Sequence, residues 1–306
     1  MLMSLGFTWR TAVFLLPALL IYAVFSAVPL MDTLRLGLYA ADDTGARHFA
    51  GLAQYATILG DPQWSQQFWN AMANNLKFFG IHLLVQNPIG LLLAALLSLR
   101  DVRGAATYRT LFFLPTLLSV VIVGFVWQLI LSPLWGVSET VLGWFGLQDW
   151  FEPWLGLEGS ALVTVSLMSV WQYVGIPMML IYAALIAIPE DIIEAARVEG
   201  ANPWRIFWHI RLPLILPTLG LVTILTFVAN FNAFDLVYTV KGALAGPNYS
   251  TDILGTLFYR TFFGYQSQVA NPTMGAAVAT LMFLLILAGV ALYFLTVQRR
   301  LRRFAL

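Results

Sequence analysis

The chain alternates between long segments without any charged side chain and segments that hold its Lys, Arg, Asp and Glu residues. Each uncharged segment is at least as long as the roughly 20 residues that an α-helix needs to cross a bilayer. Backbone N–H and C=O groups find no partners in lipid, so segments that cross it must be helical. We therefore predict an all-α, polytopic membrane protein with six transmembrane helices. The uncharged segments run from Thr11 to Met31, Phe78 to Leu99, Thr110 to Ser138, Gly159 to Pro189, Leu212 to Phe234 and Thr261 to Gln298.

Composition narrows the class of protein further. Only 10% of the residues are charged and 60% are hydrophobic, whereas soluble domains carry about 25% charged residues. We therefore predict one membrane domain across residues 1–306. The formal net charge of +1 gives no reason to expect nucleic-acid binding, because the basic residues are spread among the loops. The chain has no cysteine, which excludes disulfides, thiolate metal ligands and cysteine nucleophiles.

Lysine and arginine are concentrated in alternate loops, and these residues favour the cytoplasmic side of a membrane. With the N-terminus inside, the inner segments hold Arg10, Arg100, Arg103, Arg109, Arg197, Arg205, Arg211, Arg299, Arg300, Arg302 and Arg303. The outer or border positions hold only Arg35, Arg47, Lys77, Lys241 and Arg260. We predict that both termini lie in the cytoplasm, with the C-terminal basic cluster at the anionic lipid of the inner leaflet.

The residue patterns of common catalytic and nucleotide sites are absent from the sequence. It contains no G-x-x-x-x-G-K-[ST], G-x-G-x-x-G, H-E-x-x-H or G-x-S-x-G pattern. His48, His82 and His209 lie in separate segments without metal-ligand spacing, and His82 is interpreted as a hydrogen-bonded membrane histidine. No Asp, Glu, Lys or Arg lies deep in a predicted span, where ion-coupled carriers usually keep titratable groups. We predict a non-catalytic chain without a metal or cofactor, which would need energy from another subunit to move a solute uphill.

The first outer segment, at about residues 32–77, contains a helix start. Asp caps helices and Pro suits their first turn, so Asp61-Pro62 predicts a short helix. Trp64 and Trp69 follow, and aromatic residues favour the membrane interface. We expect this helix to lie at the membrane surface.

The polar segment at residues 188–213, on the predicted inner side, indicates two short helices joined by a tight turn. Gly200 suits a left-handed exit from the first helix, and Asn202-Pro203 suits the start of the second as cap and first residue. Pro213 is expected to mark the beginning of the next span. Ala195-Ala196 would leave a smooth surface that another protein could approach closely.

The same segment resembles the EAA signature, E-A-A-x(3)-G-x(9)-I-x-L-P, of permease subunits of binding-protein-dependent ABC importers. Every defining position is present at the right spacing: Glu194, Ala195, Ala196, Gly200, Ile210, Leu212 and Pro213. Phe227-x-x-Asn230-Phe231-Asn232-x-Phe234 resembles the carbohydrate branch, and Gly246-Pro247 and Tyr259-Arg260 resemble its first type, the larger permease of the maltose system. Two departures are visible. Glu199 stands where the branch often has Asp, and the extra N-terminal helices and large outer domain of the maltose example are missing.

The resemblance implies a type I ABC importer permease fold in a bacterial-type inner membrane. It also implies the other subunits: a second, related permease, two copies of a cytosolic ATPase that binds ATP and Mg, and an extracytoplasmic solute-binding protein. In this family the EAA helix seats in a cleft of the ATPase and transmits its closure. The signature residues are therefore expected to couple this chain to the ATPase.

The resemblance to the carbohydrate branch implies transport of a mono-, di- or oligosaccharide. Asn230 aligns with an asparagine at the sugar site of the maltose permease, and Trp171, Tyr173 and Asn232 are expected companions by depth and chemistry. Polar residues in spans also tie helices together, so that interpretation stays open for each of them. The alternatives are a permease for another polar solute such as glycerol phosphate, a self-contained secondary carrier, and an intramembrane enzyme. The carrier predicts buried ionisable residues or inverted repeats, and the enzyme needs a nucleophile or metal cluster.

Overall fold

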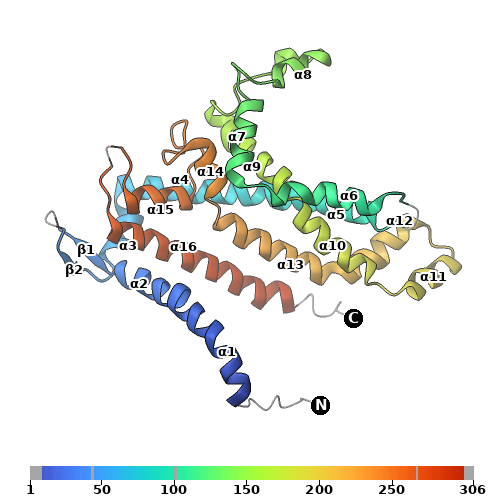
Figure 1. Ribbon diagram of the computed structural model, residues 1–306, viewed down its shortest axis with the longest axis horizontal. Helices are drawn as coiled ribbons and strands as arrows, with labels where there is room; N and C mark the ends of the chain where they lie inside the picture. The colour runs from blue at the N-terminus through green and yellow to red at the C-terminus, as the bar shows by residue number, and fades with distance from the viewer. Residues whose placement is uncertain (1–8, 43–44, 100–101, 267, 300–306) are drawn as a thin grey trace. The chain divides into compact units, whose positions relative to one another are not determined.

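The computed structural model describes residues 9–42, 45–99, 102–266 and 268–299 (Figure 1). Of the inner-side arginines, Arg100, Arg300, Arg302 and Arg303 lie outside the described residues. The described secondary structure is helical apart from two three-residue strands, which confirms the all-α prediction. The chain divides into two compact units. The prediction of one permease domain across residues 1–306 stays a prediction.

The first unit comprises the chain up to Ser65 together with Phe258–Phe283. In order it contains α1 (Trp9–Tyr22), η1 (Ala23–Ala27), α2 (Val28–Leu36), β1 (Tyr39–Ala41), β2 (Arg47–Phe49) and α3 (Ala53–Gly60), followed later by parts of α15 (Leu254–Phe263) and α16 (Pro272–Leu292). The two strands pair antiparallel, with Tyr39 opposite Phe49. A Cβ on Gly275 would lie 2.7 Å from the Cα of Phe262. Glycine at this position therefore allows α16 to pack closely against α15.

The second unit comprises Gln66–Leu257 and Leu284–Leu306 and carries the sites described below. Its first helices are α4 (Pro62–Ile81, from Gln66 on), η2 (His82–Gln86), α5 (Asn87–Leu97), α6 (Ala105–Phe113), η3 (Leu114–Leu117), α7 (Val120–Ile130), α8 (Ser138–Trp144) and η4 (Gln148–Trp150). There follow α9 (Glu158–Tyr173), α10 (Gly175–Ile186), α11 (Glu190–Val198), α12 (Pro203–Ile206), η5 (Phe207–Arg211), α13 (Leu212–Phe231), α14 (Asp235–Lys241) and, in the C-terminal part, η6 (Tyr293–Gln298).

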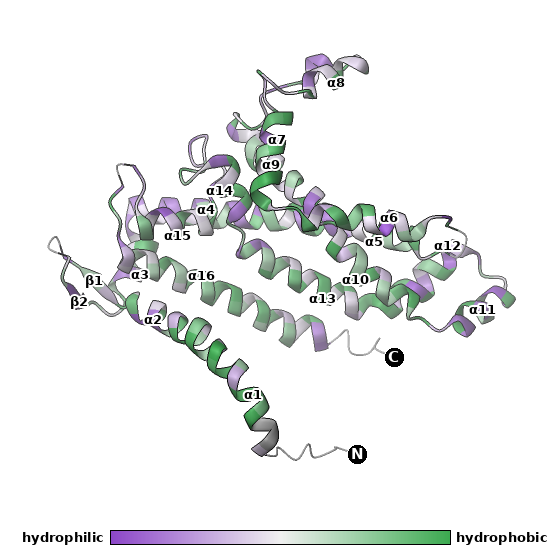
Figure 2. Cartoon of the chain, in the orientation of Figure 1, coloured by the Kyte–Doolittle hydropathy of each residue, from purple (hydrophilic) through white to green (hydrophobic). Residues whose placement is uncertain are grey.

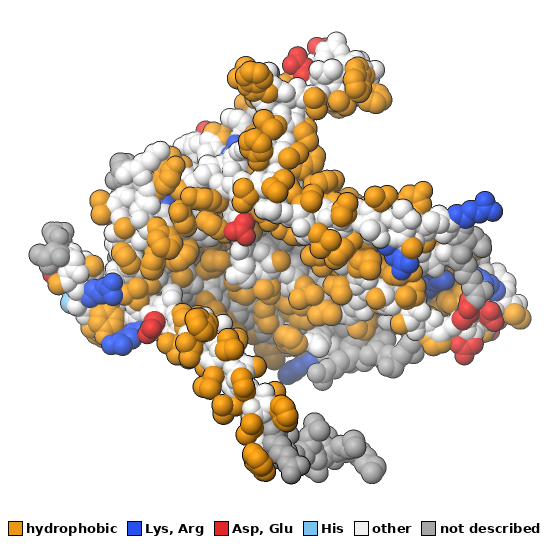
Figure 3. Space-filling model, viewed as in Figure 1, with side chains coloured by type: hydrophobic (Ala, Val, Ile, Leu, Met, Phe, Trp, Pro, Cys, Tyr) orange, Lys and Arg blue, Asp and Glu red, His pale blue; other side chains and the backbone are white. Residues whose placement is uncertain are grey.

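Two apolar clusters form the core of the second unit. One joins α7, α9 and α14 through buried residues such as Val123, Val165 and Val237. The other joins α5, α10 and α13, where Met178 and Ile181 are fully buried. Apolar residues make up most of the long helices (Figure 2). Many apolar side chains are nevertheless exposed, such as Leu92 and Leu221 of the second unit, and orange side chains cover much of the face in Figure 3.

The six predicted spans correspond to four continuous helices and two bent helix pairs. Four are continuous helices long and apolar enough to cross a membrane: Val13–Leu36, Pro62–Leu97, Pro203–Phe231 and Pro272–Gln298. Two are bent pairs, Ala105–Leu117 with Val120–Ile130 at 96° and Ala161–Tyr173 with Gly175–Ile186 at 43°. Counting each bent pair as one span gives six. The third and fourth predicted spans are therefore bent rather than straight.

The two bends have local causes. Leu118 and Ser119 adopt extended backbone conformations, which interrupt the helical hydrogen bonds between η3 and α7. Pro177 lies in the first turn of α10, where it lacks an N–H group and its ring crowds the preceding turn. Neither bend alters the alternation of charged and uncharged segments, which is why the sequence pattern did not reveal them.

The expectation of a short helix after Asp61 is wrong, whereas the location of its first turns at the membrane surface stays a prediction. The Oδ1 of Asp61 accepts hydrogen bonds from the N–H groups of Gln63 and Trp64 over 3.0 and 3.1 Å, so the predicted cap forms. The helix that it starts, however, runs without a break from Pro62 to Leu97. The polar residues of its first turns therefore belong to a membrane-spanning helix.

Three prolines inside the continuous spans each follow a π-helical turn that ends two residues earlier, whereas Pro17 and Pro217 lie inside α-helix. The turns are η1 before Pro29, η2 before Pro88 and η5 before Pro213. In each turn the residue just before the proline donates its N–H to the carbonyl five residues back. A proline ring clashes with the carbonyl four residues back in a regular helix. The wider turn shifts the hydrogen-bond register upstream of the ring, so the span continues through the proline.

Candidate functional site

The segment at residues 188–213 folds into the two predicted helical parts joined by a tight turn. At the end of α11, the N–H of Ala201 donates to the carbonyl of Ala196 and the N–H of Gly200 donates to that of Arg197, each over 3.0 Å. This pair of bonds is the Schellman arrangement, which requires a left-handed residue. Gly200 has a φ of +84°. The predicted left-handed exit is confirmed.

The second helical part begins at the predicted cap. The Oδ1 of Asn202 accepts a hydrogen bond from the N–H of Arg205 over 2.8 Å, and Pro203 is the first helical residue. Pro213 does not begin a new helix, because one helix runs from Pro203 to Phe231, and its place at the entry to the membrane stays a prediction. The π-helical turn of η5 accommodates Pro213 within it.

A small apolar cluster holds α11 against α12. Ile193, Ala196 and Ile206 form it, and each is at most 8% exposed. Ala196 therefore lies inside the loop, and the expectation that it forms part of a smooth outer surface is wrong. Residues three apart share one face of a helix, so Ala196 is buried on the same face of α11 as Ile193.

The other signature residues occupy different environments. Glu194 and Ala195 are exposed on the opposite face of α11. Ile210 packs on the cluster just described, and Leu212 packs on the core formed by α5, α10 and α13. Pro213 is half-buried. The signature thus supplies two exposed residues and a set of residues that shape and anchor the loop, while its role in ATPase coupling stays a prediction.

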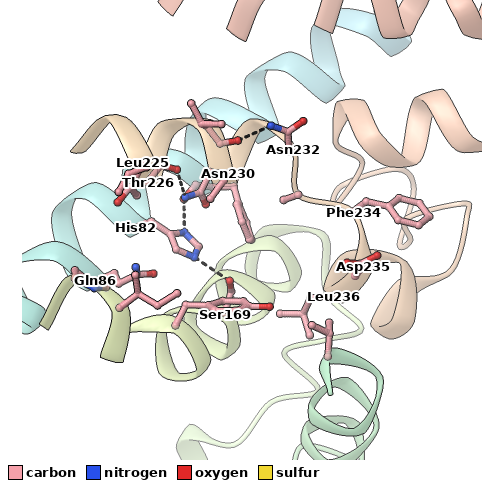
Figure 4. A pocket seen from close by; sticks show the side chains of 18 of the residues that line it. His82, Gln86, Ser169, Leu225, Thr226, Asn230, Asn232, Phe234, Asp235 and Leu236 are labelled. Atoms are coloured by element: carbon pink, nitrogen blue, oxygen red, sulfur yellow. Dashed lines mark hydrogen bonds between the residues drawn. The ribbon is translucent and has the colours of Figure 1, made fainter. Parts of the chain in front are cut away.

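A cavity of about 570 Å³ opens among η2, α9, α10 and the end of α13 (Figure 4). Its lining is mainly apolar, as in most small-molecule sites, which have volumes of about 300–1,000 Å³ and a few convergent polar groups. The polar side chains of the lining are His82, Gln86, Ser169, Tyr173, Thr226, Asn230, Asn232 and Asp235.

Three of the four predicted solute residues line this cavity: Tyr173, Asn230 and Asn232. Trp171 does not line it. The ring of Trp171 contacts that of Trp127 edge-on, with a centroid distance of 5.6 Å. Residues two apart on a helix point about 200° apart, so Trp171 and Tyr173 on α9 face different surroundings.

Asn230 is buried and has one unused hydrogen-bonding atom. Its Nδ2 donates to the carbonyl of Thr226, one turn earlier on the same helix, over 2.7 Å. Its Oδ1 is buried and accepts no hydrogen bond from the described residues. A buried unsatisfied acceptor costs about 1–3 kcal/mol, which makes this atom a candidate acceptor for a ligand hydroxyl.

The backbone at Asn230 is held by another buried asparagine. The Nδ2 of Asn75, on α4, donates to the carbonyl of Asn230 over 2.9 Å, and its Oδ1 accepts from the N–H of Leu254 over 2.7 Å. Asn75 thus joins the end of α13 to the start of α15. Sequence reasoning did not assign Asn75 this role, because nothing in its spacing indicates which distant backbone groups it meets.

His82 is hydrogen-bonded on both ring nitrogens, as predicted for a membrane histidine. Its Nδ1 lies 2.8 Å from the carbonyl of Phe78 and its Nε2 lies 2.9 Å from the Oγ of Ser169. A carbonyl only accepts, so the neutral ring donates from Nδ1 and accepts at Nε2 from the Ser169 hydroxyl. Gln86 lies one turn further on the same face, and its Oε1 is buried without a partner among the described residues. The i, i+4 spacing of His82 and Gln86 was the available signal for this polar face.

The electrostatic character of the cavity is neutral to acidic. Its described lining contains no Lys or Arg, and Asp235 at the start of α14 is its one carboxylate. A site of this kind can hold a polar, uncharged molecule in the middle of a helical bundle. The fold, the cavity and the separate polar loop together define a subunit of a membrane transporter.

Comparison with known proteins identifies the family. The chain belongs to the family "Binding-protein-dependent transport system inner membrane component", whose model matches residues 86–303. It is similar to the probable ABC transporter permease protein YurN of Bacillus subtilis, with 30% identity over 85% of this chain and 89% of that protein. It is also similar to the trehalose/maltose transport system permease protein MalF of Thermococcus litoralis, with 27% identity over 91% and 90% of the two chains.

A solved structure supports the fold. A chain of the bacterial alginate ABC transporter, in complex with alginate pentasaccharide-bound periplasmic protein, aligns with a TM-score of 0.78 over 96% of this chain and 95% of that one. The two sequences are 23% identical, so this likeness concerns the fold alone. The predicted class, a type I ABC importer permease in the inner membrane, is confirmed.

Proposed function

We propose that this permease forms half of the translocation pathway for a sugar and that the cavity beside Asn230 holds part of that sugar. The observation that carries the proposal is the unused, buried Oδ1 of Asn230 in a cavity of about 570 Å³. A sugar supplies hydroxyl donors for such an acceptor and C–H faces for an apolar lining. The name of the trehalose/maltose permease supports a saccharide.

The alternative solute, a phosphate ester such as glycerol phosphate, is less favoured by the charges. Proteins recognise phosphate with Arg, Lys and backbone N–H groups. The described lining of the cavity holds no basic side chain, and Asp235 would repel an anion. A neutral solute meets neither difficulty.

The proposed machine contains a second permease, two copies of a cytosolic ATPase and an extracytoplasmic solute-binding protein. ATP and Mg would bind to the ATPase, and this chain would bind neither. We further propose that both termini and the 188–213 loop face the cytoplasm. The distribution of charge supports this orientation, since Arg197, Arg205 and Arg211 belong to that loop while the segment at residues 132–158 holds four acids and no base.

Coupling in this proposal runs through α11. Its exposed Glu194 and Ala195 would contact the ATPase. The buried cluster beneath them and the Schellman turn fix α11 against the helix that continues into α13, so a movement of α11 would be transmitted to α13. ATP-driven closure of the ATPase would then bias a two-state equilibrium of the spans through one contact.

The experiment is a comparison of Asn230→Ala with Thr223→Ala in cells and in purified complexes. Both side chains bond to a carbonyl one turn earlier on α13, but only Asn230 lines the cavity. Asn230→Ala should raise the KM for uptake about 2- to 10-fold, the equivalent of one neutral hydrogen bond. Its membrane level should stay normal, because the carbonyl that Asn75 binds belongs to the backbone. Equal kinetics for the two variants would refute the assignment of Asn230 to the solute site.

A further inference from the structure

A second cavity, of about 450 Å³, lies between α5 and the helical stretch formed by α12 and η5. It is separate from the solute cavity, and the residues that line the two differ. We call it the α5–α12 groove. Its lining consists of Pro88, Leu91, Leu92, Ala95, Leu96 and Leu99 on one side and of Ile193, Arg197, Pro203, Trp204, Ile206, Phe207, Trp208 and Arg211 on the other.

The charge in the α5–α12 groove is positive and has no counterion in the described lining. Arg197 and Arg211 both line it, close enough for their charges to repel each other, and no Asp or Glu is among the lining residues that the structure describes. The Nε of Arg211 is buried and has no hydrogen-bond partner in the described chain. Its Nη1 reaches only the Oγ of Ser98, over 3.4 Å. Two neighbouring guanidinium groups, an exposed one at Arg197 and a partly buried one at Arg211, favour an anion.

The rest of the α5–α12 groove is apolar and continues along a membrane-spanning helix. Leu92 and Leu96 on α5 and Leu99 just beyond its end are about half exposed. Leu92 and Leu96 are four residues apart and share one face of the helix, which leads away from Ser98 and the arginine that contacts it. The rings of Trp204 and Trp208 stack edge-on with centroids 5.5 Å apart. Tryptophan pairs of this kind are enriched where a membrane meets water.

We propose that the α5–α12 groove binds one anionic phospholipid, with its phosphate between Arg197 and Arg211 and an acyl chain along the leucines of α5. A soluble anion would leave the leucine face uncovered, and a zwitterionic lipid would bring its own ammonium group next to the two guanidinium groups. Only an amphipathic anion matches both halves of the groove. Its location at the inner leaflet rests on the proposed orientation, but the binding measurement below does not use orientation and is independent of it.

The probe is phosphatidylglycerol, with phosphatidylcholine of the same acyl chains as the reference, added to the delipidated full-length chain in mild detergent. Native mass spectrometry reports the bound lipid. We expect the chain to retain one phosphatidylglycerol in preference to phosphatidylcholine. Arg197→Gln and Arg211→Gln should each weaken retention about 5-fold, since one basic residue near anionic lipid contributes about 1 kcal/mol. Arg211→Lys should keep most of the retention because it keeps the charge.

The matched control is Arg205→Gln, which removes an exposed arginine of α12 that does not line the groove. It should bind phosphatidylglycerol like the unsubstituted chain, and circular dichroism should confirm that all variants are folded. Excess inorganic phosphate should fail to displace the lipid. Equal retention of the two lipids, displacement by inorganic phosphate, or an equal loss in Arg205→Gln and Arg211→Gln would overturn the proposal. Competition for the groove by the purified ATPase in place of lipid would also overturn it.

Discussion

The turn at Gly200 provides a graded test of the coupling loop. Gly200 holds a φ of +84° in the Schellman turn that returns the chain from α11 to α12. A Cβ built at this position meets no atom within 4 Å. A substitution at Gly200 therefore introduces backbone strain and no steric clash, so its effect can be worked out from φ alone.

The magnitude follows from two opposing free energies. A left-handed conformation costs an L-residue about 1–2 kcal/mol, more for a β-branched side chain and less for asparagine. The packing of α11 against α12 offsets this strain. It depends on few buried side chains, and burial of Ile193 contributes about 1.5–3 kcal/mol to its free energy. The strain in Gly200→Val is comparable to this packing. One or two kcal/mol would raise the population with α11 undocked about 5- to 30-fold.

We expect uptake to fall in the order Gly, Asn, Ala, Val at position 200, with Gly200→Asn close to the unsubstituted protein and Gly200→Val strongly impaired. Uptake of the solute in cells is the primary assay. Membrane levels should be unchanged, since no span is altered, and ATPase recovery after purification in mild detergent should follow the same order. Wild-type uptake by Gly200→Val, or equal losses in Gly200→Asn and Gly200→Val, would refute the argument that the left-handed turn positions α11.

Two further predictions concern the contact of α11 with the ATPase and the orientation of the chain in the membrane. Glu194→Lys replaces attraction by repulsion at a partly desolvated contact with the ATPase, a change that can reach several kcal/mol. This variant should abolish uptake and release the ATPase from the membrane, and Glu194→Gln should be intermediate. Wild-type uptake by Glu194→Lys would contradict the coupling role of this exposed residue. Because the chain lacks cysteine, single substitutions report topology through an impermeant thiol reagent. Glu194→Cys should react only in inverted or opened membranes and Ser138→Cys in intact cells, and labelling of position 194 from outside would overturn the orientation.

The sequence determined those features that depend on neighbouring residues or on the cost of placing charge in lipid. The uncharged segments predicted the spans, because a charged side chain or an unpaired backbone group is costly in hydrocarbon. The turn at Gly200 and the cap at Asn202 were equally predictable, because each is satisfied by hydrogen bonds to groups at most five residues away. The family signature lies in the same short segment.

Only the tertiary structure decided which polar residues share a site. Tyr173 and Trp171 have similar depth and chemistry in the sequence, yet the packing of α9 against its neighbours turns the first into the cavity beside Asn230 and the second onto Trp127. Asn75 fixes the backbone of Asn230 across 155 residues of chain. Arg211, which in the sequence is one more inner-side arginine, acquires an apolar groove beside it from α5. These pairings depend on how whole helices bend and pack, and no periodicity within a single segment encodes them.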